Sequence, residues 1–222
     1  AVSGVFGVLF ALAQGDLKRL LAYSSVENVG IVSLGIGLGM LGICYGIPAV
    51  AALGFAGGLL HALNHAAFKG LLFLGAGAVV HASGTRNLER LGGLLKRMPW
   101  TGTAFLAGAV AICGLPPFNG FAGEFLIYLG TFKALLATGP VALGGLVAVV
   151  ALALIGGLAA ACFARAFGIA FLGEPRSADA ERAHEAEISM RAPTFALAAI
   201  CLAIGLGAGA AVQIMEPAVA VL

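Results

Sequence analysis

Two histidines and a lysine recur at every fourth position in the stretch His61-Ala-Leu-Asn-His65-Ala-Ala-Phe-Lys69, which lies in a long apolar run. On a helix, which rises about 1.5 Å per residue, neighbouring members of this set lie about 6 Å apart along one face. A single histidine there would often only hydrogen-bond between helices, but a lysine inside a membrane is costly unless a cavity or an acid receives it. Histidine exchanges protons near neutral pH. Three such groups on one face therefore indicate proton transfer.

Glu124 is the second candidate, and it follows a predicted break in another apolar run. Pro116 and Pro117, in Gly114-Leu-Pro-Pro-Phe-Asn-Gly120, remove two backbone donors and disfavour the helical bend before them. The carbonyls freed there must bind protein or water, because lipid cannot donate a hydrogen bond. A carboxylate about two turns later, with room for water, suits proton transfer. The alternative is a structural acid paired with a basic side chain, for which Lys69 is one of few partners inside the membrane.

Glu27 lies about one turn into the apolar segment Tyr23–Gly42, beside Asn28. Two interpretations stay open for it: a carboxylate at the mouth of a channel, or an interfacial acid paired with Lys18 or Arg19. Asp16, which precedes this run, is expected to be a loop or helix-capping residue, because an aspartate side chain accepts hydrogen bonds from the free amides at a helix start.

The composition places these residues in a membrane. Of the 222 residues, 61% are hydrophobic and only 10% are charged, and the mean hydropathy is +1.06. Soluble domains carry roughly a quarter charged residues. Only helices or closed barrels satisfy the backbone in lipid, and the long runs lack the alternation of barrel strands. We therefore expect an all-α, polytopic transmembrane bundle in the lipid bilayer, forming a single transmembrane domain over residues 1–222.

About six helices are expected from six apolar segments, which are Ala1–Ala13, Tyr23–Gly42, Ile47–His81, Trp100–Phe132, Pro140–Phe171 and Pro193–Met215. The first is shorter than the roughly 20 residues of a crossing, so we expect the sequence to begin partway through a helix. The third, fourth and fifth are longer than a straight crossing, so each must tilt, break or extend beyond the bilayer. The fourth is expected to break at Pro116 and Pro117.

Basic residues mark alternate loops, as the positive-inside rule describes for membrane proteins. The odd-numbered loops and their flanks hold Lys18, Arg19, Arg86, Arg90, Lys96, Arg97, Arg165, Arg176, Arg182 and Arg191, whereas the even-numbered loops hold only Lys133. This predicts a cell (inner) membrane protein with its odd loops, including 173–192, in the cytoplasm and its C-terminus outside. The stretch Ala178–Ser189 has helical propensity, which indicates a solvated surface helix or, alternatively, a docking element for a partner subunit.

Motifs that would supply energy or redox chemistry are absent from the sequence. It contains no Walker sequence, no CxxC and no haem or iron–sulfur pattern. We therefore expect no cofactor, no metal and no catalytic redox site in this chain. The four cysteines, Cys44, Cys113, Cys162 and Cys201, are widely spaced, and small buried hydrophobic side chains are expected at these positions. Transport through the chain then needs an ion gradient or a redox partner.

Three stretches resemble the antiporter-like subunits of respiratory complex I, Mrp antiporters and membrane-bound hydrogenases, in the family's order and at similar separations. They are Ala13-Gln-Gly-Asp-Leu-Lys-Arg-Leu-Leu-Ala-Tyr-Ser-Ser25, His61 to Leu74 and Gly114 to Phe125. The family contains two repeats of inverted topology, each with a broken helix. The chain resembles the second repeat together with a C-terminal helix. Because the first repeat is missing, the resemblance implies only the exit half of a pathway.

The resemblance also implies roles for single residues. Pro116 and Pro117 match the second broken helix, and Glu124 matches its proton-carrying residue. The remaining matches are Lys69 with the buried lysine of the preceding helix, His61 and His65 with the histidines of the hydrophilic axis, and Asp16 and Lys18 with polar residues of an earlier loop. Ser25-Val-Glu-Asn-Val-Gly30 and the stretch from Leu115 to Glu124 resemble the large membrane subunits of hydrogenase-4 and formate hydrogenlyase.

These inferences predict a proton-translocating subunit of a redox-driven oxidoreductase complex, of the hydrogenase or NADH:quinone type. Protons would pass among Lys69, His65 and His61 through water to Glu124, with Glu27 as a weaker candidate. The expected partners are other membrane subunits and a peripheral redox arm, with no nucleic acid. Two alternatives are a sodium–proton antiporter module of the Mrp type and a non-pumping membrane anchor for a soluble hydrogenase or dehydrogenase.

Overall fold

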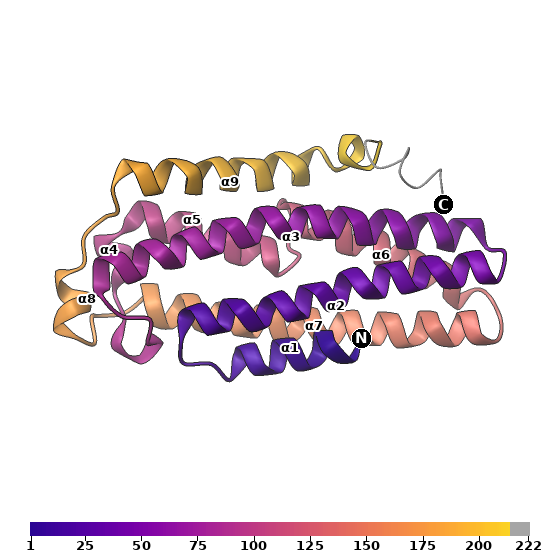
Figure 1. Cartoon of the computed structure of the whole chain (residues 1–222), viewed down its shortest axis with the longest axis horizontal. Coiled ribbons are helices and arrows are strands. Elements are labelled where there is room, and N and C mark those ends of the chain that lie inside the picture. The colour runs from indigo at the N-terminus through magenta and orange to yellow at the C-terminus, as the bar shows by residue number, and fades with distance from the viewer. Residues whose placement is uncertain (214–222) are drawn as a thin grey trace.

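The computed structural model of the protein describes residues 1–213, and every regular element in that part of the chain is a helix. In chain order the helices are α1 (Val2–Leu12), α2 (Leu17–Cys44), α3 (Pro48–Ser83), the 3-10 helix η1 (Leu88–Arg90), α4 (Leu94–Arg97), α5 (Pro99–Ile112), α6 (Asn119–Leu135), α7 (Pro140–Phe171), α8 (Ala178–Arg182) and α9 (Ile188–Leu206). The long helices run side by side along one bundle, with α9 along one flank (Figure 1). The predicted all-α membrane bundle is confirmed.

Local sequence sets where the long helices begin. Asp16 caps α2, since its carboxylate accepts from the amides of Lys18 and Arg19 at 2.9 and 3.0 Å. Proline opens α3, α5 and α7 at Pro48, Pro99 and Pro140. A proline at the first helical position costs no hydrogen bond, because the amide there has no partner inside the helix.

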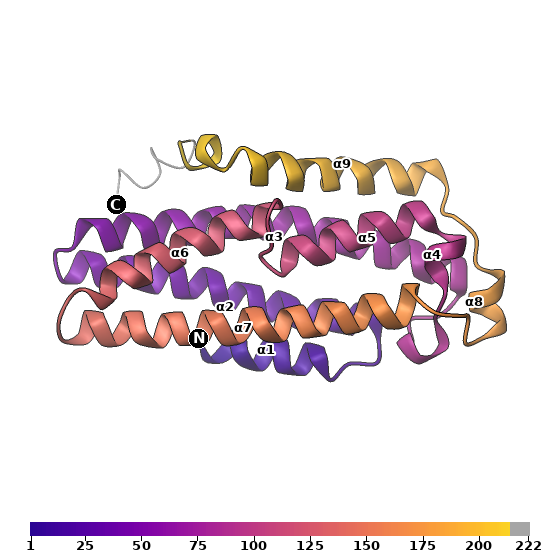
Figure 2. The ribbon, with the colours of Figure 1, turned by 180° about the vertical axis from the view of Figure 1, so that it is seen from behind.

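The predicted break at the double proline is present. Helix α5 ends at Ile112, α6 begins at Asn119, and Gly114 takes the left-handed φ of +63° between them. Figure 2 shows α5 and α6 as two halves of one path, joined near the middle of the bundle. Helices α3 and α7 stay unbroken over 36 and 32 residues, or about 54 and 48 Å. They must therefore tilt or extend beyond the bilayer, as the sequence predicted for long segments.

Four helices of residues 1–213 are long and apolar enough to cross a membrane, namely α2, α3, α7 and α9, while α1 and α5 are shorter apolar helices. The count of about six crossings stays a prediction. Helix α9 begins at Ile188, earlier than the predicted Pro193, and the end of the segment predicted up to Met215 lies outside the described residues. The helix predicted over Ala178–Ser189 was wrong in extent, because α8 ends at Arg182.

The connections that carry most of the basic residues meet at one end of the bundle, here called the basic end (Figure 1). The amide of Leu88 donates to the carbonyl of Gly15 at 2.8 Å, which joins the connection between α3 and α4 to the connection between α1 and α2. Arg90 forms an ion pair with Asp179 at 3.0 Å, which joins the connection between α3 and α4 to the connection between α7 and α9. The alternation of loops is therefore present in the fold, whereas the cytoplasmic side of the basic end stays a prediction.

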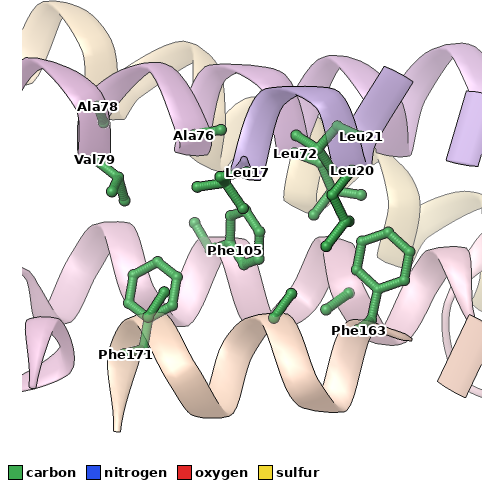
Figure 3. Close-up of a cluster of buried hydrophobic side chains, with 14 of the residues drawn as sticks. Leu17, Leu20, Leu21, Leu72, Ala76, Ala78, Val79, Phe105, Phe163 and Phe171 are labelled. Carbon is green, nitrogen blue, oxygen red and sulfur yellow. The ribbon is translucent and has the colours of Figure 1, made fainter. Parts of the chain in front are cut away.

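Apolar packing is continuous near the basic end, where α2, α3, α5 and α7 meet (Figure 3). The side chains in this cluster include Leu17, Leu20 and Leu21 of α2, Leu72, Ala76 and Val79 of α3, Phe105 of α5, and Phe163 and Phe171 of α7. Lipid tails are as apolar as leucine, so close packing rather than exclusion of water must hold these helices together. This packed layer lies beside the buried polar residues of α2 and α3.

Candidate functional site: a buried polar set across three helices

Lys69 reaches from α3 to the neighbouring helix α2. Its ammonium donates to the carbonyl of Leu21 at 2.8 Å and to the hydroxyl of Ser24 at 2.5 Å, and the residue is only 6% exposed. Within residues 1–213 no carboxylate lies within 4.0 Å of it. The sequence predicted a cavity or an acid as its partner. The structure instead supplies two neutral oxygens, which accept hydrogen bonds from the ammonium but do not neutralise its charge.

His61 is fully buried and also contacts α2. Its Nε2 lies 3.1 Å from Oδ1 of Asn28, and the Asn28 amide nitrogen donates to the carbonyl of Ser24 at 2.8 Å. Because that amide nitrogen is engaged as a donor, Oδ1 must accept, so Nε2 of His61 carries a hydrogen. In the neutral ring Nδ1 is then an acceptor, and within the described chain it has no donor.

His65 lies between His61 and Lys69 on the same face of α3 and is half-buried. Its Nε2 is buried and has no partner within residues 1–213. The ring of Phe68 meets both imidazoles edge-on, with centroid separations of 6.1 Å to His61 and 5.6 Å to His65. Phe68 therefore packs against both imidazoles, and the ring nitrogens of His61 and His65 are the polar atoms that remain for hydrogen bonding.

Two asparagines join α3 to the first turn of α6, directly after the break. The side-chain amide of Asn64 donates to the backbone carbonyl of Asn119 at 2.7 Å, and the Asn119 amide donates back to Oδ1 of Asn64 at 3.3 Å. The sequence analysis gave no role to either Asn64 or Asn119. The position of Asn119 between the double proline and Glu124 was the available signal, because a polar side chain next to freed carbonyls is a natural partner for them.

Glu124 lies on α6 with its carboxylate against the break. A methyl group on Gly114 would lie 2.6 Å from Oε2 of Glu124, and a methyl group on Gly123 would lie 2.8 Å from Cα of His61. The backbone of α6 therefore touches α3 at His61, one residue before the acid. Glu124 has no hydrogen bond or ion pair within residues 1–213, so the alternative of a structural acid paired with Lys69 is not observed in the described chain.

Glu27 is buried rather than interfacial. It is 1% exposed, its Oε2 has no partner within residues 1–213, and it forms no ion pair with Lys18 or Arg19. On α2 it directly precedes Asn28, which is the hydrogen-bond partner of His61. We call Glu27 and eight further residues the polar set: Ser24, Asn28, His61, Asn64, His65, Lys69, Asn119 and Glu124.

Asp16 and Lys18 do not join the polar set. The Asp16 carboxylate caps α2 and pairs with Arg86 at 3.4 Å, as expected for a capping residue. Lys18 is half-exposed at the basic end. Among residues 1–213 there is also no group of three or more His, Cys, Asp or Glu side chains that could hold a metal ion.

The connection between α7 and α9 packs on the chain itself at the basic end. The carboxylate of Glu185 accepts from the amides of Trp100 and Thr101 at 2.8 and 3.4 Å and from the Thr101 hydroxyl at 2.6 Å, so it caps α5 from a distant segment. Lys96 donates to Glu174, and this hydrogen bond keeps the pKa of that exposed carboxyl below its usual value. Part of the predicted loop 173–192 thus packs against α4 and the first turn of α5 of the same chain.

Comparison with known proteins gives consistent matches. Residues 1–151 match the family described as "NADH:quinone oxidoreductase/Mrp antiporter, TM". The chain is 47% identical to hydrogenase-4 component B of Escherichia coli over 94% of its own length and 31% of that protein. It is 46% identical to formate hydrogenlyase subunit 3 of the same organism, over 93% of its length and 34% of that protein.

The fold also matches solved membrane complexes. A chain in respiratory complex I from Thermus thermophilus with bound NADH superimposes with a TM-score of 0.74 and 27% identity, covering 99% of this chain and 42% of that one. The chain thus spans about a third of the length of the two Escherichia coli relatives and less than half of this structural neighbour.

Proposed function

Because the chain belongs to the NADH:quinone oxidoreductase/Mrp antiporter transmembrane family, we propose that its polar set conducts protons across the membrane for a redox-driven complex. The chain is an antiporter-like membrane subunit of the hydrogenase and complex I type, related to Mrp antiporter subunits. It covers only part of its relatives, so the activity of the whole protein belongs to the proposal.

One observation carries the proposal: the buried polar atoms that lack a protein partner gather in the polar set. Residues 1–213 contain five such atoms, and four of them are Oε2 of Glu27, Nδ1 of His61, Nε2 of His65 and Oδ1 of Asn119. An unsatisfied buried polar atom costs about 1–3 kcal/mol, and such atoms are rare in folded proteins. Ordered water relieves this cost. Water at these four atoms would supply the hydrogen-bonded neighbours that proton hops require.

The order of the groups along α3 suggests a route. Of the three ionisable residues on one face of α3, Lys69 is closest to the basic end, followed by His65 and then His61 toward the middle of the bundle. At that level the backbone of α6 touches His61, and Glu124 follows one residue later. We propose that protons pass from Lys69 through the two imidazoles and water to Glu124, and that they leave at the end opposite the basic end.

The remaining partners and the membrane side follow from the same proposal. The relatives are named as hydrogenase and formate hydrogenlyase subunits, so we propose that other membrane subunits and a peripheral redox arm drive the protons. The basic end would face the cytoplasm of a bacterial inner membrane. The predicted outside position of the C-terminus concerns residues that the structure does not describe.

The two alternative functions have less support. A sodium ion would need oxygen ligands, and the two oxygens next to Lys69 already accept hydrogen bonds from its ammonium. A non-pumping membrane anchor would not need buried ionisable groups, which are costly inside a membrane.

The decisive experiment is proton release by the assembled complex in sealed vesicles, with Glu124→Gln compared with wild type. We expect proton release to fall by roughly a hundredfold, because the amide cannot carry a proton, while redox turnover and assembly persist. The matched control is Glu89→Gln, which changes an exposed acid of η1 at the basic end. Unchanged proton release in Glu124→Gln would refute the route and favour the membrane anchor. Repeating the assay without sodium separates proton pumping from sodium–proton exchange.

A further inference from the structure

A cavity of about 310 Å³ opens at the basic end between the first turns of α5 and α9, lined by Trp100, Ile188, Arg191, Ala192 and Phe195. The rings of Trp100 and Phe195 meet edge-to-face at 5.9 Å and form one wall. Trp100 and Ile188 are 57% and 69% exposed, so the cavity opens outward from the bundle. We call it the basic-end groove. Nothing in the proton route uses it.

Arg191 brings to this apolar groove a guanidinium without an ion pair in the described chain. Its Nε is the fifth buried polar atom without a partner within residues 1–213, and no carboxylate of these residues lies within 4.0 Å of it. The nearby acid Glu185 is occupied by the amides of α5. Glu187, the N-cap of α9, also forms no ion pair with Arg191. An anion in the groove would be stabilised by the guanidinium.

The position of the groove identifies the kind of anion. Tryptophan concentrates where a membrane meets water, and basic pockets between transmembrane helices on the positive side bind anionic head groups. We propose that the basic-end groove binds an anionic phospholipid. Its phosphate contacts the guanidinium of Arg191, which matches phosphate geometry. One acyl chain lies along Trp100, Ile188 and Phe195. This site is independent of the polar set, so either proposal can fail alone.

Trp100 provides the readout, because it is the single tryptophan of the chain. The complex is reconstituted into nanodiscs that contain either brominated phosphatidylglycerol or brominated phosphatidylcholine at equal mole fraction. Bromine quenches indole fluorescence only at contact. The signal of Trp100 is the difference between the wild-type complex and Trp100→Phe. We expect about fivefold stronger association of the anionic lipid with Trp100, as expected for about 1 kcal/mol from one basic residue at the membrane surface.

Arg191→Gln should abolish this preference, and Arg191→Lys should keep part of it. Arg182→Gln is the control, because it removes an equal charge from the exposed end of α8 and leaves the groove intact. Equal quenching by the two lipids in the wild type would overturn the proposal. So would a preference that survives Arg191→Gln. Absence of quenching by either lipid would show that another protein segment covers the groove, which also overturns it.

Discussion

The carbonyl of Leu21 accepts more donors than an ordinary helical carbonyl does. The hydroxyls of Ser24 and Ser25 donate to it at 3.1 and 3.2 Å, in addition to the Lys69 ammonium at 2.8 Å. Serine hydroxyls that bond back to the preceding turn can compete with the backbone pattern. Here they gather around the oxygen that receives the lysine. Neutral groups of α2 therefore bind Lys69, and we call the Leu21 carbonyl and the Ser24 hydroxyl the Lys69 seat.

Ser24→Ala tests that seat. The substitution removes the acceptor at 2.5 Å from the Lys69 ammonium and leaves one carbonyl to hold it. A hydrogen bond to a charged group contributes about 1.5–3 kcal/mol, so we expect proton release by the complex in sealed vesicles to fall by about tenfold or more. Ser33→Ala is the control, because its hydroxyl bonds only to the carbonyl of Val29 within the same helix. Equal proton release in both variants would show that Leu21 alone suffices.

Sequence reasoning identified the ionisable members of the polar set but only part of their surroundings. Lys69, His61, His65 and Glu124 are conspicuous, because charged or titratable groups are costly in an apolar run. The roles of Ser24 and Asn119 depend on which helix faces meet, and small polar residues are common on membrane helices for packing reasons alone. No periodicity in a single sequence shows which face of one helix packs against which face of another. These two contacts could therefore be seen only in the structure.

Gly114 connects the break to the acid. Its φ of +63° suits glycine, and a methyl group there would also meet Oε2 of Glu124 at 2.6 Å. Gly114→Ala is therefore expected to displace the carboxylate and to reduce proton release in sealed vesicles, besides costing about 1–2 kcal/mol of backbone strain.

Gly84→Ala separates the two effects of that substitution. Gly84 follows α3 with a φ of +65°, and nothing lies within 4 Å of a methyl group added there. It should carry the strain alone, so a modest loss of thermal stability is expected with proton release unchanged. Equal losses of proton release in Gly114→Ala and Gly84→Ala would mean that strain, rather than contact with Glu124, limits transport.

The helices that were predictable are those whose ends have local chemistry. The double proline predicted the break between α5 and α6, and Asp16 was expected as a cap. The helix expected over Ala178–Ser189 was too long because Glu185 leaves the helical path to cap α5. That contact joins segments more than eighty residues apart in sequence, and local propensity carries no record of it.

The distribution of charge over the molecule predicts its orientation. Connections rich in Lys and Arg gather at the basic end, whereas the opposite end carries only Lys133 near its turns. Single cysteines at Arg182 and Thr138, both exposed and on opposite ends, test this. A membrane-impermeant thiol reagent should label Arg182→Cys only from the cytoplasmic side and Thr138→Cys only from the other side. Cys44 is exposed, contrary to the sequence expectation, so the background needs Cys44→Ser. Reversed labelling would invert the proposed direction of transport.

At this largest scale the sequence predicted the bundle and the alternation of its loops, because both follow from apolar segment length and charge. The place of α9 was not predictable, since an apolar helix can pack on any apolar flank of the bundle. The resemblance to hydrogenase-4 and formate hydrogenlyase subunits is confirmed by the matches to both.

The packing of α9 over the break has a consequence for membrane tightness. A methyl group on Gly205 of α9 would collide with the carbonyl oxygen of Pro117 and would lie 2.9 Å from the amide nitrogen of Asn119. Backbone groups freed from a helix would otherwise draw water or ions to the lipid face. Helix α9 therefore covers backbone groups of the break. Under the proposed function, we expect that loosening α9 would let charge leak passively across the vesicle membrane and dissipate the gradient even while the polar set remains intact.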